Sequence, residues 1–351
     1  MSSSSGDAGG PRRGYHLEIL LACFAGLLLE IAYTRIVSFK LFYYYTYLVI
    51  GLALLGIGTG GVVVTISKRI RAASTEAVLL WTFLFGAASV AIGYFVVALT
   101  SVDTLAIWEY GTRGSFSSIA RLVLICLAIF ASFISVGIIV STLFGRRSDD
   151  IGRLYFFDLL GAGLACAVVV SLLGWIGPPA TILLAGLVMA LCGARLALRD
   201  RPAVAIGAGV LAVLLLAGVV APSLLPDQRI DASKVQLDDD DTIFSAWSPI
   251  FRVDVAEVSP DVRVLYHDAL HGSGIYRFDG DLSTLDRFDT DPRLFPFETA
   301  GKAPGKVLII GAAGGNEVLA SLHFDAGHVD AVELNPVTYD LVTDEMADYS
   351  G

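Results

Sequence analysis

Seven long apolar segments fill the first 221 residues, and the remaining residues carry apolar positions in short alternating runs. Each segment has about 20 mostly apolar residues, the length that a helix needs to cross a hydrocarbon core about 30 Å thick. The segments run over residues 17–38, 43–66, 77–99, 119–143, 154–176, 179–198 and 203–221. We therefore expect a disordered tail over residues 1–16 and a multi-pass helical bundle, embedded in a lipid bilayer, over residues 17–221.

The pattern after residue 221 is that of a water-soluble domain. Residues 222–242 are acidic and contain four consecutive aspartates, which we interpret as a solvated linker because they lack the spaced ligands of a calcium loop. Alternating runs then predict strands over residues 250–258, 262–267 and 274–278. These strands predict a small antiparallel β subdomain over residues 243–300, followed by a different pattern over residues 301–351.

Composition separates the same two parts. The chain has a mean hydropathy of +0.70 and 17% charged residues, where soluble proteins have about 25%. Residues 1–221 hold 15 Lys and Arg against 10 Asp and Glu, whereas residues 222–351 hold 9 against 24. An acidic soluble half argues against nucleic acid as a partner, because phosphate backbones are bound by clustered Lys and Arg. It suits a polyamine or another cationic small molecule.

Loop charges predict how the bundle is oriented. Eleven Lys and Arg flank the spans on the N-terminal side, and three lie on the other side. The positive-inside rule then places the N-terminus in the cytoplasm and, with seven spans of the inner (plasma) membrane, the acidic domain outside. An error of one span would reverse the side of the domain.

Three charged residues lie inside predicted spans, where charge is costly and is a functional candidate by default. Glu30 and Arg35 are five positions apart, about 140° around a helix, so they cannot pair as i,i+4 neighbours. Each needs a partner on another helix, and we expect Arg35 to pair with Asp158. The alternatives are an ion pair that fixes helix packing and a pathway for a substrate or for protons.

Two glycine-rich stretches require opposite interpretations. Gly56–Gly61 matches a dinucleotide-binding pattern but lies within a span, so we expect it to let helix backbones approach closely. Gly311–Gly315 follows a buried-strand run over residues 306–310 and precedes a helix over residues 316–323. Because this second stretch has the required strand and helix around it, it is the better candidate for a ligand site.

The strand predicted after this turn and its helix ends in an acid. Residues 328–332 form a strand run, and Glu333 follows it, 22 positions after Gly311. At this spacing an acid at a parallel strand tip meets ribose hydroxyls, while the glycines let a ligand approach the backbone. We therefore predict the start of a Rossmann-like nucleoside-binding fold over residues 301–351. The predicted cofactor-binding residues are Gly311, Ala313, Gly314, Gly315 and Glu333.

These residues resemble motif I of the class I S-adenosylmethionine-dependent fold, and in particular the spermidine synthase (polyamine aminopropyltransferase) group. With seven spans, with Leu29–Arg35 in the first and with Gly152–Ala162 at the fifth, the chain is similar to membrane-fused spermidine-synthase-like proteins. The resemblance implies a donor, S-adenosylmethionine or its decarboxylated form, no metal, and transfer of an aminopropyl or methyl group to an amine. It implies that Gly311, Ala313 and Gly315 line the adenosyl pocket.

The chain also departs from that family. Phe297–Thr299 stands where the soluble enzymes have Tyr-His-Glu, and the family's catalytic aspartate lies on a later strand tip, beyond Gly351. We therefore expect a fragment that lacks the catalytic half and is inactive by itself, with unknown catalytic residues. The alternatives are a polytopic transporter or sensor with a non-catalytic nucleoside-binding or polyamine-binding domain, and a membrane scaffold.

Overall fold

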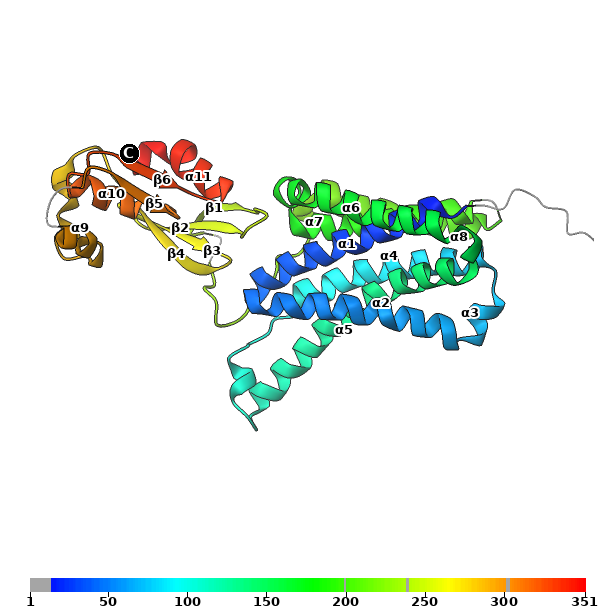
Figure 1. Cartoon of the computed structure of the whole chain (residues 1–351). Helices are drawn as coiled ribbons and strands as arrows, with labels where there is room; N and C mark the ends of the chain where they lie inside the picture. Colours follow the sequence, from blue (N-terminus) through cyan, green and yellow to red (C-terminus); the bar gives the residue numbers. More distant parts are fainter. Residues whose placement is uncertain (1–13, 199, 238–239, 301–303) are drawn as a thin grey trace, which may run out of the picture.

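The computed structural model describes residues 14–198, 200–237, 240–300 and 304–351, and it combines a helical bundle with a smaller α/β domain at one end (Figure 1). Within those residues, seven helices are long and apolar enough to cross a membrane, which confirms the predicted number. They are α1 (His16–Lys40), α2 (Thr46–Ile66), α4 (Thr75–Leu99), α5 (Arg113–Arg146), α6 (Ile151–Trp175), α7 (Gly177–Ala197) and α8 (Pro202–Val220). The predicted tail over residues 1–16 lies mostly outside the described residues, and α1 already begins at His16.

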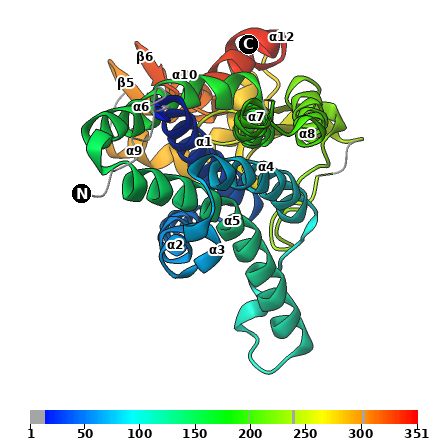
Figure 2. The same ribbon diagram turned by 90° about the vertical axis from the view of Figure 1, so that its right-hand side faces the viewer.

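The bundle is arranged around α1, which Figure 2 shows among the other helices in a view along its length. α1 contacts α2, α5, α6 and α7, and its buried face continues into the bundle core. A short helix, α3 (Lys68–Ala72), connects α2 to α4 at the N-terminal end of the bundle. Because the number of spans is odd, the chain enters at this end and leaves at the other, where the α/β domain lies (Figure 1).

Glycines bring α2 and α5 into backbone contact. A Cβ added to Gly60 would lie 2.6 Å from the carbonyl oxygen of Ile134, and one added to Gly137 would lie 2.2 Å from that of Ile57. Only residues without a side chain permit this approach between two helices. The interpretation of Gly56–Gly61 as a packing surface is therefore confirmed for Gly56 and Gly60, whereas a Cβ added to Gly58 would meet no heavy atom within 4 Å.

The first sheet of the α/β domain is antiparallel and meanders in sequence order: β1 (Thr242–Ala246), β2 (Val253–Ser259), β3 (Val262–His267) and β4 (Leu270–Tyr276). The predicted antiparallel subdomain is confirmed, with β1 as an additional strand. The turn between β3 and β4 has two residues, Asp268 and Ala269, with φ of 51° and 58°. Positive φ at both turn positions matches the twist of a tight hairpin.

The second sheet has two parallel strands, β5 (Val307–Ile310) and β6 (Val329–Val332), joined by α10 (Asn316–His323). Short helices α9 (Phe295–Ala300), α11 (Pro336–Asp340) and α12 (Ala347–Ser350) complete the domain. The C-terminal helical segment packs on the antiparallel sheet: Leu341 and Met346 lie in one core with Val255 and Ile275. Residues 243–300 and 304–351 therefore pack against each other, through contacts of α10 and α12 with β4 as well.

The segment after α8 is a packed connection, which corrects the prediction of a solvated linker. The backbone N–H of Arg229 donates to Ala98 O (2.9 Å) and that of Asp231 to Lys40 O (2.8 Å), so the segment caps the ends of α4 and α1. Asp231 and Lys234 are buried. Free carbonyl groups at helix ends need donors, and here the connecting chain supplies them. Asp238 and Asp239 of the aspartate run lie outside the described residues.

Candidate functional site

The glycine-rich turn lies between the end of β5 and the start of α10. The N–H groups of Gly311 and Ala312 donate to Val332 O at 2.8 and 3.1 Å, which ties the turn to the end of β6. Gly311 and Gly315 have φ of 82° and 83°, in the left-handed region that favours glycine. Ala313 also lies in that region, with φ of 44°, and is strained there because its Cβ comes close to the backbone.

Gly314 packs against the antiparallel sheet. A Cβ added to Gly314 would lie 2.3 Å from the carbonyl oxygen of Gly274 in β4, too close for any larger side chain. Asn316, which is buried two residues further along, donates from its side-chain Nδ2 to the carbonyl oxygen of Gly274 at 3.1 Å. Its Oδ1 accepts from Arg287 Nη2 at 2.7 Å. β4 therefore fixes the position of the turn through backbone contact and one buried amide.

Glu333 lies at the end of β6, where the sequence places it, and closes the turn from the other side. Its Oε2 accepts the N–H of Ala313 at 2.9 Å, and its Oε1 accepts the N–H of Asn335 at 2.8 Å. Each carboxylate oxygen keeps a second lone pair. Glu333 can therefore hold the turn and still accept hydrogen bonds from two vicinal hydroxyls.

A cavity of about 460 Å³ opens at this turn. Ala313, Gly314, Gly315 and Glu333 line it, which brings together four of the five predicted cofactor-binding residues, while Gly311 shapes the backbone behind them. The volume lies in the range of small-molecule sites. Six further polar or aromatic residues line the cavity without a signal in the sequence, because only the packing of β4 and the C-terminal helices brings them there: Tyr276, Phe278, Thr338, Tyr339, Thr343 and Ser350.

The cavity is apolar with few polar groups. Glu333 is the one carboxylate side chain that lines it in the described part of the chain, and no Lys, Arg or His side chain does. Thr338 is fully buried, and its hydroxyl has no hydrogen-bond partner among the described residues. The aromatic ring of Tyr276 is held from outside by the guanidinium of Arg287, 3.7 Å from the ring centroid. The cavity thus offers aromatic surface, several hydroxyl-bearing side chains and one charged side chain.

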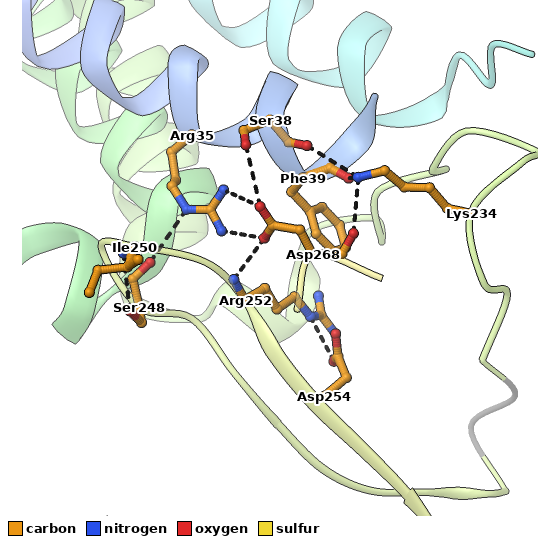
Figure 3. Close-up of polar contacts among 9 residues, drawn as sticks. All are labelled: Arg35, Ser38, Phe39, Lys234, Ser248, Ile250, Arg252, Asp254 and Asp268. Atoms are coloured by element: carbon orange, nitrogen blue, oxygen red, sulfur yellow. Dashed lines mark hydrogen bonds and ion pairs between the residues drawn. The ribbon is translucent and has the colours of Figure 1, made fainter. Parts of the chain in front are cut away.

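Arg35 pairs with the α/β domain and not with α6, so the predicted Arg35–Asp158 pair is wrong. Its guanidinium forms a two-point ion pair with Asp268 at the β3–β4 turn, with Nη1 to Oδ2 at 3.1 Å and Nη2 to Oδ1 (Figure 3). Ser38 Oγ and the N–H of Arg252 donate to the same carboxylate at 3.3 and 2.8 Å. Asp268 therefore receives four donors at the end of the bundle.

Lys234 reinforces this junction between the bundle and the domain. Its Nζ donates to Phe39 O at 2.6 Å, Ser38 O at 3.2 Å and Asp268 O at 2.9 Å (Figure 3). A cation at the C-terminal carbonyls of α1 is favoured by the helix dipole. Burial nevertheless lowers the pKa of Lys234 to about 8, although the nearby Asp268 opposes the shift.

The other two intramembrane charges do not meet Arg35. Asp158 on α6 accepts from the thiol of Cys23 on α1 at 2.6 Å, so it links two helices near the N-terminal half of the bundle. Glu30 is half-buried, and its carboxylate forms no hydrogen bond or ion pair with any residue in the described ranges. The structure therefore separates Glu30, Arg35 and Asp158 and does not bring them into one pathway.

No known protein family, curated protein or solved structure matches this chain.

Proposed function

We propose that the chain is a membrane-anchored nucleoside-binding protein whose ligand is S-adenosylmethionine or its decarboxylated form. The observation that carries the proposal is the position of Glu333 at the tip of β6, where it borders the cavity. Each of its carboxylate oxygens accepts one backbone hydrogen bond, from Ala313 and from Asn335. Its remaining lone pairs suit the two hydroxyls of a ribose. The domain would be the start of a Rossmann-like fold, as the order of strand, turn, helix and strand suggests.

The rest of the cavity lining suits a ligand that carries a flat aromatic base and a positive charge. Tyr276 and Phe278 provide aromatic surface for an adenine ring, and Thr338, whose buried hydroxyl has no partner among the described residues, borders the cavity. Glu333 is the sole charged side chain of the lining within the described residues, so a sulfonium ligand would meet no cationic side chain there.

The chemistry proposed with this ligand is transfer of an aminopropyl or methyl group to an amine. The amine lone pair attacks the carbon attached to sulfur, the C–S bond breaks with its electron pair going to sulfur, and the new ammonium releases a proton. The enzyme would act mainly by orienting donor and acceptor. In the described residues, no second carboxylate and no histidine lines the cavity to assist the amine, so the cavity supports donor binding and assigns no catalytic residue.

Equilibrium binding tests the proposal directly. We expect the purified full chain in detergent to bind S-adenosylmethionine or its decarboxylated form. Glu333→Gln should weaken binding by about 10- to 100-fold, because hydrogen bonds to charged groups contribute about 1.5–3 kcal/mol. Glu345→Gln is the matched control, since Glu345 is exposed and lies outside the cavity lining. Absence of binding to the wild-type chain, or equal binding by Glu333→Gln, would contradict the proposal.

A second candidate function is sensing, in which ligand binding in the domain is linked to the state of the bundle without turnover. One observation favours it: a single hairpin carries Asp268, paired with Arg35, at its tip and Gly274, packed on Gly314, in its second strand. A ligand-affinity change in Arg35→Lys, with the fold retained, would support sensing. Group transfer by the chain to a polyamine would support the transferase.

Orientation separates these candidates further. The loop charges favour a cytoplasmic N-terminus, and seven spans then put the α/β domain on the opposite side, away from cytoplasmic adenosyl compounds. A reporter fused after Gly351 that is active on only one side of the membrane would test this. A cytoplasmic result would favour the transferase, and an external result would favour a binding module for another nucleoside.

A further inference from the structure

A second cavity lies at the other end of the bundle, between α3, α4 and α5. It has a volume of about 290 Å³, and among the residues that line it are Arg69, Ala73, Ala77, Trp81, Phe85 and Ile138. Trp81 and Phe85 are 52% and 47% exposed, so the cavity is a groove that opens on the flank of a membrane-spanning helix. It shares no residue with the cavity at the glycine-rich turn.

The groove changes in polarity along its length. Arg69 belongs to the short helix α3 at the end of the bundle, where the water interface is expected. Phe85 lies ten residues into α4, about 15 Å along the helix axis. One end of the groove thus offers a guanidinium, and the rest offers aromatic and aliphatic side chains. A ligand that fits this order has a polar head and an apolar tail.

A second guanidinium lies beside the groove. The guanidinium of Arg201, just before α8, lies 5.9 Å from the centroid of the Trp81 ring. Neither Arg69 nor Arg201 forms an ion pair with a carboxylate of any residue that the structure describes. Arg146, by contrast, is committed to the carbonyls of Ile70 and Ala73 at 2.5 and 2.7 Å, and so it fixes α3 in place. Arg69 in the groove lining and Arg201 beside Trp81 are therefore two guanidinium groups without a carboxylate partner among the described residues.

We propose that this groove binds an anionic phospholipid, with one acyl chain along Trp81, Phe85 and Ile138 and the phosphate between Arg69 and Arg201. Charge complementarity selects an anionic head, because guanidinium groups bind phosphate through several donors. The apolar length of the groove and its position on the flank of the bundle select a lipid over a soluble phosphate. Trp81 suits this depth, since tryptophan favours the boundary between head groups and acyl chains.

The test compares lipids and variants with the full chain in a neutral detergent. We expect native mass spectrometry to show retention of phosphatidylglycerol at least tenfold above phosphatidylcholine, and we expect phosphatidylglycerol to raise the melting temperature. Arg69→Ala/Arg201→Ala should abolish the preference. Lys68→Ala/Arg71→Ala is the matched control, because it removes the same charge from residues of α3 outside the groove lining and should keep the preference.

A larger side chain in the groove distinguishes a lipid bound there from a general attraction of anions to the arginines. Ala77→Phe should reduce retention of the acyl chain while leaving both arginines in place, and Ala73→Leu serves if Ala77→Phe fails to fold in lipid-free detergent. Inorganic phosphate at millimolar concentration should not displace the lipid. Equal retention of the two lipids, equal losses in the two double variants, or displacement by phosphate would each overturn the proposal.

Discussion

Arg35 and Asp268 are 233 positions apart in the chain and form a two-point ion pair that joins the first membrane span to the tip of the β3–β4 hairpin (Figure 3). The side chains are 6% and 14% exposed, so both charges have lost most of their water. Breaking such a pair is costly, because removing either partner leaves the other charge buried and uncompensated.

Replacing Arg35 with Ala should therefore lower the free energy of unfolding by about 3–5 kcal/mol, the cost typical of breaking a buried pair. Unfolding of the full chain in detergent measures it. Arg153→Ala is the control, because Arg153 is 78% exposed and its i,i+3 contact with Asp150 is 3.9 Å long. That change should stay within about 1 kcal/mol. Similar losses in the two variants would contradict the role given to Asp268.

Gly314→Ala should destabilise the domain, because its Cβ would meet the carbonyl oxygen of Gly274 at 2.3 Å. Overpacking of this kind costs about 1–3 kcal/mol. Gly305→Ala makes a comparison in the same domain, since a Cβ there would have no heavy atom within 4 Å. Thermal melting of both variants checks the prediction, and wild-type stability in Gly314→Ala would show that the turn does not pack on β4.

Thr338→Val separates ligand binding from folding. The hydroxyl of Thr338 is buried without a partner among the described residues, so a side chain of the same shape without it should not lower the melting temperature. If the hydroxyl bonds to the nucleoside, the dissociation constant should rise about two- to tenfold, as expected for loss of one neutral hydrogen bond. Unchanged affinity would remove Thr338 from the site.

Acidification should destabilise the chain through His267. Burial lowers its pKa below the ordinary value of 6.5, although Glu333 and Asp268 oppose the shift. Between 6.5 and the lowered pKa, the unfolded chain binds a proton that the folded chain excludes, so the free energy of unfolding falls as the pH falls. His267→Asn should show a smaller decrease in melting temperature from pH 7.5 to 5.5. His328→Asn, at an exposed position, should keep the wild-type decrease.

Lys234 should change the free energy of unfolding in the alkaline range, whereas His267 changes it in the acidic range. Because its pKa is lowered from 10.5 to about 8, the folded chain loses a proton that the unfolded chain retains between these values. Its contribution to the free energy of unfolding therefore rises with pH from about 8 to 10.5. The difference in melting temperature between wild type and Lys234→Met should grow in favour of wild type over this range. Lys306→Met, at an exposed position, should not produce this change.

The sequence by itself determined the local features of this protein. Seven apolar runs of sufficient length predict seven spans, because a backbone in lipid must satisfy its hydrogen bonds within a helix. Alternation predicts β2 and β3, and the order of strand, glycine-rich turn, strand and Glu333 places that carboxylate beside the turn, where Ala313 donates to it. These features depend on residues close in sequence, so periodicity and spacing carry the information.

Only the tertiary structure decided which distant groups meet. Arg35 needed a partner, and spacing could not choose Asp268 over Asp158, because both are far from it in sequence and the choice depends on how a hairpin docks on the bundle. The same docking buries Lys234 within a segment whose composition suggests a solvated linker. Burial and ion pairing over such separations are set by the packing of whole elements, and no local pattern of residues specifies it.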